Sequence, residues 1–125
     1  MNGERRIAGF TLIELLVVMA IIGLLLALAS PRYFNSLDRS KETALREDLR
    51  VLRSQIDKFQ GDTGRYPRTL EELVDAKYLR SIPVDPITGS ATTWQVVAPA
   101  EGEGVADVAS GATGNARDGK AYAEL

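Results

Sequence analysis

The side chains of this 125-residue chain offer few combinations that could do chemistry. The sequence contains neither histidine nor cysteine, which excludes Ser-His-Asp and Cys-His catalysis, a disulfide framework and the commonest metal ligand. Two carboxylate pairs, Glu71 with Glu72 and Asp118 with Glu124, are the best candidates for general acid and base groups. The first pair is better explained as the charged first turn of a helix. The residues therefore argue against an enzyme.

Glu14 is the ionisable residue in the least usual setting. It is the one charged side chain between Gly9 and Ala29. From Phe10 to Ala29 is 20 residues, and a helix of this length spans about 30 Å, the thickness of a bilayer hydrocarbon core. A charge in the hydrocarbon costs roughly 2.5 to 3.5 kcal/mol. Glu14 therefore needs a partner or a function.

The residues around Glu14 resemble the processing site of type IV pilin-like proteins. The run Arg5-Arg6-Ile7-Ala8-Gly9 is similar to their short basic leader, and Phe10-Thr11-Leu12-Ile13-Glu14 is similar to the start of their mature chain. The resemblance implies that a prepilin peptidase cuts between Gly9 and Phe10 and that Phe10 is then N-methylated. Residues 1–9 would be the leader, and residues 10–30 a helix that first spans the membrane and later forms the core of a filament.

Cleavage would supply the cation that Glu14 lacks. The new amine of Phe10 would lie one helical turn from Glu14, because residues i and i+4 share a helix face. The cation can come from the same chain or from the freed N-terminus of a neighbour, and the family resemblance implies the second arrangement. We therefore expect Glu14 to guide the addition of subunits to a filament.

A secretory signal peptide is the competing interpretation of this segment. Ala27-Leu28-Ala29 before Ser30 matches a small-residue cleavage site. The apolar run is longer than the usual core of about 7 to 15 residues, and it contains Glu14. The mature N-terminus distinguishes the two interpretations, because it is a methylated Phe10 in one and Ser30 in the other.

Pro31 follows the apolar run directly. A proline inside a helix removes one main-chain hydrogen bond and crowds the preceding turn, so the sequence predicts a kink at Pro31. The alternative is a simple boundary between a membrane helix and a soluble helix.

Residues 31–60 are predicted to form the amphipathic half of one long helix. One face carries a repeating apolar stripe of Leu45, Leu49, Leu52, Ile56 and Phe59. The stripe covers barely two heptads, so we expect it to pack on the chain's own sheet rather than in a coiled coil. Glu42 with Arg46, and Arg53 with Asp57, are spaced for ion pairs along the helix.

Residues 61–125 are predicted to form a loop, a short helix and a small C-terminal sheet. Gly61 and Gly64 are expected to end the long helix, and Thr69 with Glu72 has the spacing of a capping box. The prolines of residues 78–86 predict a loop. Strands are predicted at Thr92–Val97 and Val105–Val108, with a third strand or an ordered tail at Lys120–Glu124. The expected fold class is α+β, with the long N-terminal helix packed on a small antiparallel sheet.

Two motifs after the long helix narrow the family resemblance. Gly64-Arg65-Tyr66-Pro67 and Pro83-Val84-Asp85-Pro86 are similar to segments of the major pseudopilin of type II secretion systems. The resemblance implies a homo-oligomeric filament in the periplasm that drives protein secretion, with a prepilin peptidase, an inner-membrane assembly platform and minor pseudopilins as partners. The alternative is a type IV pilin of a surface fibre for motility, adhesion or DNA uptake. The missing cysteines and the Pro-x-Asp-Pro motif argue against this alternative.

Charge gives an expected orientation. Arg5 and Arg6 should stay in the cytoplasm by the positive-inside rule, which places everything after Ala29 on the periplasmic side of a bacterial inner membrane. The formal net charge is −2, which argues against a nucleic-acid-binding surface.

The family resemblance also implies a calcium ion near the C-terminal end, and no other cofactor is expected. Asp107, Asn115 and Asp118 could supply the oxygen ligands that calcium prefers. Their spacing matches no recognisable calcium loop. The calcium site is therefore an expectation from the family more than from the residues.

Overall fold

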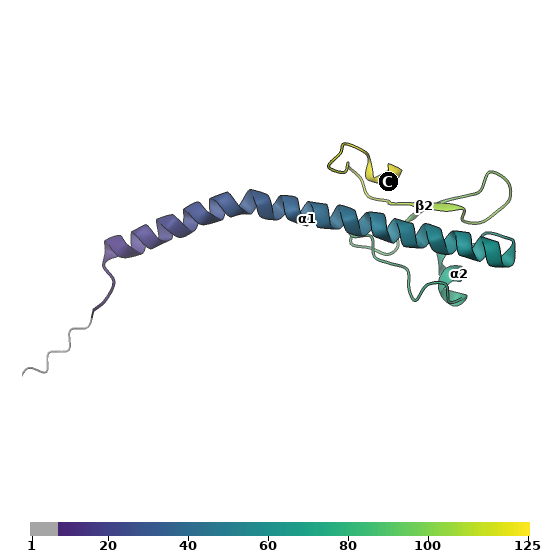
Figure 1. The fold of residues 1–125 in the computed structure, drawn as a ribbon, viewed down its shortest axis with the longest axis horizontal. Coiled ribbons are helices and arrows are strands. Elements are labelled where there is room, and N and C mark those ends of the chain that lie inside the picture. The colour runs from purple at the N-terminus through teal and green to yellow at the C-terminus, as the bar shows by residue number, and fades with distance from the viewer. Residues whose placement is uncertain (1–7) are drawn as a thin grey trace, which may run out of the picture. The chain divides into compact units, whose positions relative to one another are not determined.

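The computed structural model describes residues 8–125, apart from the side chain of Asn35. It contains, in chain order, α1 (Leu12–Thr63), α2 (Leu70–Asp75), β1 (Gln95–Val97), β2 (Asp107–Ala109) and the short 3-10 helix η1 (Tyr122–Glu124) (Figure 1). The chain divides into two compact units, one ending at Leu37 and one running from Asp38 to Leu125, so that α1 contributes to both. The predicted α+β class is confirmed.

One face of α1 forms the core of the second unit. The predicted apolar stripe is buried along its whole length, with exposed fractions of 0–2% for Leu45, Leu49, Leu52, Ile56 and Phe59. It packs against Leu70 and Leu73 of α2 and against Trp94, Val105 and Val108 from the region of the sheet. Fully burying an apolar side chain of this size contributes about 1.5 to 3 kcal/mol. The stripe therefore packs within the chain's own fold, as the sequence predicts.

The sheet consists of two antiparallel strands that are shorter than predicted. Val96 lies opposite Val108 in the centre of the ladder. β1 begins at Gln95 rather than Thr92, because the hydroxyl groups before it form a turn network instead of a ladder: Thr93 bonds Thr88 at 2.7 Å. β2 begins at Asp107 rather than Val105.

Of the two alternatives predicted for residues 120–124, the structure has the ordered tail and not the third strand. Residues 122–124 form η1, and the segment before it makes only an isolated antiparallel bridge between Asn115 and Ala121. Between these two residues the chain turns back on itself, with the Ala116 N–H donating to the Lys120 carbonyl at 2.7 Å. Gly119 in this turn has φ +86°, a conformation that glycine adopts readily. The pairing stops after this bridge because η1 begins at the next residue, Tyr122.

α1 ends three residues later than predicted, at Thr63 instead of Gln60. Gly61 lies inside the helix. Gly64 ends it in the left-handed conformation, with φ +77° and its N–H bonded to the Gln60 carbonyl at 2.9 Å. Of the two glycines predicted to end the helix, Gly64 therefore ends it and Gly61 does not.

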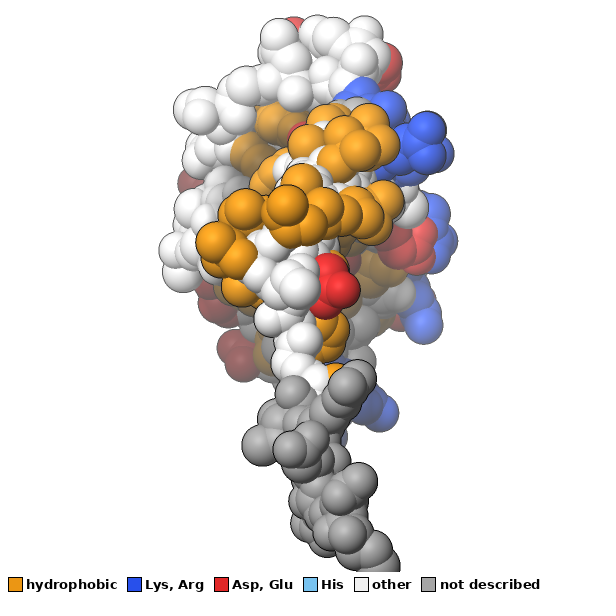
Figure 2. Space-filling model, turned by 90° about the vertical axis from the view of Figure 1, so that its left-hand side faces the viewer, with side chains coloured by type: hydrophobic (Ala, Val, Ile, Leu, Met, Phe, Trp, Pro, Cys, Tyr) orange, Lys and Arg blue, Asp and Glu red, His pale blue; other side chains and the backbone are white. Residues whose placement is uncertain are grey.

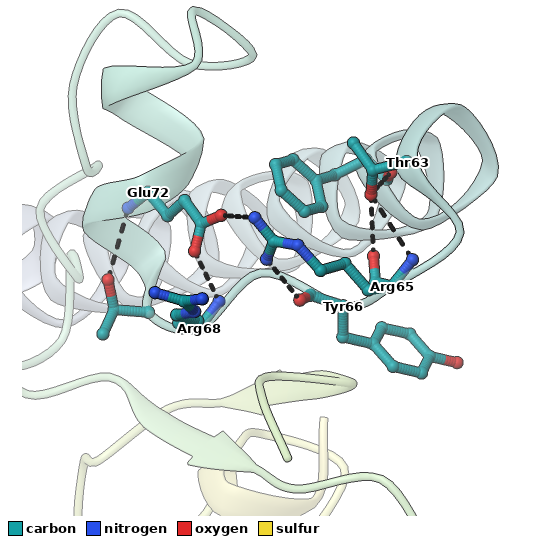
Figure 3. A network of polar contacts seen from close by, with 7 residues as sticks. Thr63, Arg65, Tyr66, Arg68 and Glu72 are labelled. Carbon is teal, nitrogen blue, oxygen red and sulfur yellow. Dashed lines mark hydrogen bonds and ion pairs between the residues drawn. The ribbon is translucent and has the colours of Figure 1, made fainter. Parts of the chain in front are cut away.

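Arg65 joins the end of α1 to the start of α2 (Figure 3). Its guanidinium lies over the Phe59 ring, 5.1 Å from the centroid, which is a cation–π contact. The same group forms an ion pair with Glu72 and donates to the Tyr66 carbonyl at 3.2 Å. The Gly-Arg-Tyr-Pro motif therefore forms a structural junction.

The capping box at Thr69 forms only in part. The Glu72 N–H donates to the Thr69 hydroxyl at 3.3 Å, as predicted. The Glu72 carboxylate, however, accepts from Arg65 and from the Arg68 main-chain N–H rather than from Thr69. The Arg65 hydrogen bond first, and the Arg68 N–H second, lower the pKa of Glu72 below its ordinary value. The Glu72 carboxylate thus binds Arg65 instead of completing the capping box with the Thr69 N–H.

Asp85 of the Pro-x-Asp-Pro motif is fully buried and organises its loop. One carboxylate oxygen accepts from the N–H groups of Ile87 and Thr88, at 2.8 and 3.3 Å. The other accepts from the Ser110 hydroxyl at 2.6 Å. The motif therefore ties the loop to the segment after β2, and its carboxylate is satisfied by neutral donors.

The ion pairs predicted along α1 are replaced by pairs with the C-terminal segment. Arg46 pairs with Asp118 at 3.5 Å rather than with Glu42, and Arg53 pairs with Asp107 at 2.8 Å rather than with Asp57. These arginines meet carboxylates that the fold brings to the helix, whereas i,i+4 pairs on a solvated face contribute only a few tenths of a kcal/mol. The prediction was wrong because it considered the helix alone.

Candidate functional site around Glu14

The N-terminal half of α1 presents apolar side chains that no other described part of the chain covers. The large apolar residues from Leu12 to Leu28 are 44–76% exposed. Figure 2, viewed from this end, shows hydrophobic side chains gathered on the surface. By length and composition the helix is able to cross a membrane, and none of its most apolar stretch is buried in the fold. This half therefore needs a lipid or protein surface from outside the chain.

Glu14 takes part in a capping box at the start of α1. The Thr11 carbonyl accepts the first helical hydrogen bond, from the Leu15 N–H at 3.2 Å. The Thr11 hydroxyl accepts from the Glu14 N–H at 3.2 Å, and the Glu14 carboxylate accepts from the Thr11 N–H at 3.3 Å. This reciprocal pair satisfies two otherwise unpaired donors at the helix start. The Thr-x-x-Glu spacing is the sequence signal for this box, although it was not among the features predicted above.

Within residues 8–125, no cation pairs with the carboxylate of Glu14. Its donor is a neutral amide, and the other carboxylate oxygen has no hydrogen-bond partner within residues 8–125. The positive end of the helix dipole favours a carboxylate at this position, by about 0.3 to 1 kcal/mol at an exposed site. Glu14 is thus held in a fixed place at the helix start while it can still accept a cation.

In the uncleaved chain, Phe10 lies before the first turn of α1. α1 begins at Leu12, and Thr11 is the residue that caps it. Phe10 therefore precedes the helix, with 88% of its surface exposed. The i,i+4 geometry expected between Phe10 and Glu14 concerns the chain after cleavage and stays a prediction; in the uncleaved chain the capping residue Thr11 separates Phe10 from the helix.

Gly9 has no structural role within the described chain. A side-chain carbon built on Gly9 would meet no atom within 4 Å. The predicted scissile bond between Gly9 and Phe10 lies outside regular secondary structure. The leader residues Arg5 and Arg6 lie outside the described residues, as does the rest of the leader before Ala8. If glycine is required at position 9, the requirement would therefore come from recognition by a processing enzyme and not from packing within the described chain.

Pro31 lies inside α1, which continues on both sides of it. The predicted kink stays a prediction. Tyr33 and Phe34 follow, with ring centroids 5.8 Å apart in an edge-to-face arrangement and side chains 65% and 59% exposed. Aromatic residues beside an apolar run are typical of a membrane–water boundary. This aromatic pair was not predicted from the sequence.

The three residues expected to bind calcium each have a partner within the chain's own fold. Asp107 pairs with Arg53, and Asp118 pairs with Arg46, two helical turns earlier on α1. Asn115 lies in the bridge with Ala121. Among residues 8–125, no cluster of three or more acidic side chains could hold a metal ion. The two carboxylates already face a positive charge each, which a calcium ion would have to displace.

Comparison with known proteins agrees with the N-terminal site. The model of the prokaryotic N-terminal methylation motif matches residues 5–30, which include Gly9, Phe10 and Glu14. This match defines the class of the chain's N-terminal segment. No solved structure matches the chain.

Relatives along more of the chain carry a more specific name. Type II secretion system core protein G of Pseudomonas aeruginosa is 34% identical over 99 residues, which cover 66% of this chain and 70% of the relative. The protein of the same name from Klebsiella michiganensis is 31% identical over 109 residues, 74% of this chain and 75% of the relative. Fimbrial protein EcpC of Eikenella corrodens is 32% identical over 120 residues, 89% of this chain and 76% of the relative. The chain belongs to the family of type II secretion system core protein G, the major pseudopilins.

Proposed function

We propose that this chain is a structural subunit of the filament of a type II secretion system. The main observation is the exposed apolar half of α1, whose start is capped by Thr11 and Glu14 within the methylation motif. A prepilin peptidase would remove residues 1–9 and methylate Phe10. The subunit would wait in the inner membrane, with its second unit in the periplasm. Assembly would then bring together many copies, with minor pseudopilins and an inner-membrane platform as partners.

Energetics explain why anchor and assembly surface are the same element. The exposed apolar side chains of α1 are stable in lipid, and burial of apolar area contributes about 25 cal/mol per Å² relative to water. A subunit that leaves the membrane must therefore cover this surface again. The same half of neighbouring copies offers a matching apolar surface, so that a bundle of these helices can replace the lipid.

Glu14 would accept the amine of a neighbour's Phe10. In the uncleaved chain Phe10 precedes the helix, and cleavage would free its amine to reach a neighbouring subunit. The capping box holds the Glu14 carboxylate at a fixed position while leaving its charge available. In a low-dielectric core, an unpaired carboxylate is strongly disfavoured. A subunit that supplies a cation at the correct axial position would therefore be selected over one in the wrong register.

Glu14→Gln tests this proposal with the capping geometry kept. The amide oxygen of the introduced glutamine can still accept from the Thr11 N–H, but the negative charge is lost. We expect processing to continue and filament assembly to fall at least tenfold, measured by cross-linking and electron microscopy of processed subunits. Thr11→Ala is the matched control, since it keeps the charge and removes the hydroxyl of the box. Normal filament formation by Glu14→Gln would refute the role of Glu14.

The proposal also predicts the mature N-terminus. Mass spectrometry of the protein from cells with a prepilin peptidase should find a chain that begins with N-methylated Phe10. A chain beginning at Ser30 would instead establish the signal-peptide interpretation and would leave no membrane helix for assembly.

The fimbrial relative gives a specific reason to test a second function. EcpC, named as a fimbrial protein, aligns with 89% of this chain, so a surface fibre is the alternative. Deletion of the gene separates the two functions. Loss of exported enzymes from the medium supports the secretion filament, and loss of surface fibres with normal secretion supports the pilin. The relatives named as core protein G favour the first outcome.

A further inference from the structure

We propose that Arg53 clamps the C-terminal segment of this chain onto α1 and that this segment folds without calcium. The segment concerned runs from β2 to Leu125. The expectation of a calcium ion and the arginine clamp make opposite predictions for the same residues. The inference concerns the fold of the single subunit and does not depend on the proposed filament.

The geometry of Arg53 carries the inference. Its Nε donates to a carboxylate oxygen of Asp107 at 2.8 Å. Its Nη2 donates to the main-chain oxygens of Val108 and Leu125, at 2.9 and 2.7 Å. One guanidinium therefore binds both ends of a segment that otherwise contains few regular elements. Charge-assisted bonds of this kind are roughly twice as strong as neutral ones.

The neighbours of Arg53 on α1 explain why its guanidinium lies beside the C-terminal segment. Leu52 and Ile56 are fully buried in the same core cluster as Val108 of β2, which fixes this turn of α1. The Arg53 side chain is 37% exposed, so its guanidinium lies at the edge of the core and not in bulk water. Partial burial reduces the screening of its charge relative to a fully exposed pair.

The chain between the two ends closes on itself with main-chain and side-chain contacts. The Asn115–Ala121 bridge and the Ala116–Lys120 hydrogen bond fold this part into a narrow turn. Arg46 then pairs with Asp118 at its tip. Contacts within the chain therefore hold this turn closed and tie its tip to α1.

The carboxylates expected to bind calcium are already engaged. The Oδ1 atom of Asp107 accepts from Arg53 and also from the Val108 N–H at 2.7 Å. Asp118 accepts from Arg46 and from the Lys120 N–H at 3.0 Å. A calcium ion beside either carboxylate would face a guanidinium of the same sign, which disfavours its binding.

Thermal unfolding of the full processed chain in detergent micelles tests the inference. We expect the same Tm with excess EGTA and with excess CaCl₂. Arg53→Ala should lower the Tm by roughly 5 to 10 °C, because it releases three hydrogen bonds of a small folded unit. Arg50→Ala is the matched control: it pairs with Glu47 on its own helix, and its loss should shift the Tm by about 1 °C.

Limited proteolysis gives a second readout in case Arg53→Ala fails to fold. Arg53→Lys and Asp107→Asn each keep part of the contact, and both should expose the segment after β2 to cleavage several times faster than in the wild type. Calcium should not slow this cleavage. A wild-type Tm raised several degrees by calcium would overturn the inference. So would wild-type proteolysis rates in both variants.

Discussion

Two parts of α1 carry the same residue types in different surroundings. Leu24 and Leu26, before Leu37, are 60% and 63% exposed, whereas Leu45 and Leu52, in the second unit, are fully buried. Periodicity separates them, because the first part is apolar on all sides and the second on one face. The second part of α1 is therefore stabilised by contacts within its own chain. The first part requires a partner surface that the chain does not provide.

The two units also treat carboxylates differently. In the second unit the buried Asp85 receives three hydrogen bonds from its own fold. Within the described part of the first unit, Glu14 receives one, from the backbone N–H of its capping residue. A fold with a core can surround a charge with donors, whereas an isolated helix offers only its end. Compared with Asp85, Glu14 therefore has more capacity left for a partner.

The largest effect should come from leucine truncation in the second part of α1. Leu52→Ala removes a fully buried side chain from the core and should lower the free energy of unfolding by about 2 to 5 kcal/mol. Leu24→Ala, on the exposed part, should leave the unfolding of the second unit unchanged. Chemical denaturation of both variants in detergent checks the comparison. Equal losses would show that the first part is also packed against the fold.

Glycine substitutions should show the same contrast. A side-chain carbon on Gly111 would overlap the Thr93 carbonyl, so Gly111→Ala should cost about 1 to 3 kcal/mol through overpacking of the segment beside β1. Gly9→Ala meets open space and should leave the Tm unchanged, while it slows processing by a prepilin peptidase. Thermal melts combined with a cleavage assay separate the two effects. A stable Gly111→Ala variant would contradict the predicted close approach.

The threonines that cap the two helices, Thr11 for α1 and Thr69 for α2, should show the same contrast with a smaller change in stability. Thr11→Ala and Thr69→Ala each remove a hydroxyl that accepts an N–H at a helix start, which costs about 1 kcal/mol. Thr69→Ala should lower the Tm of the second unit. Thr11→Ala should instead accelerate hydrogen exchange at Leu12 to Leu15 with no change in that Tm. A lowered Tm in both variants would mean that the two units unfold together.

The smallest expected change in stability comes from substituting Asp48, and it should depend on pH. Burial first, then repulsion from Asp85 and Glu47, raises the pKa of Asp48 above its ordinary value. The folded state thus binds this proton more tightly than the unfolded state, so the charged form is destabilising at neutral pH and the penalty vanishes below the ordinary pKa. Asp48→Asn should raise the Tm slightly at pH 7 and leave it unchanged near about pH 3.

Glu47→Gln is the control for Asp48→Asn. Its hydrogen bond with Arg50 lowers the pKa of Glu47, so its charge is favourable in the folded state above the ordinary pKa. Removing it should lower the Tm slightly at pH 7, opposite in sign to Asp48→Asn. An increase in both variants would point to general relief of negative charge rather than to the position of Asp48.

Local patterns made much of the molecule predictable. The apolar run, the stripe from Leu45 to Phe59 and the short helix after Thr69 depend on residues within a turn or two of one another, so the sequence displays them directly. The methylation motif is equally local. The capping box of Thr11 and Glu14 was also readable, since its two residues are three positions apart.

Only the tertiary structure decided which charges meet and where the elements end. Arg53 and Asp107 are 54 positions apart, and Arg46 and Asp118 are 72 positions apart. Their contacts depend on how the C-terminal segment crosses α1, and the path of this segment depends on the whole core. The sequence by itself determined a capped apolar helix that needs a partner. Packing decided that arginines hold the opposite end of the chain, because long-range neighbours exist only once the fold has formed.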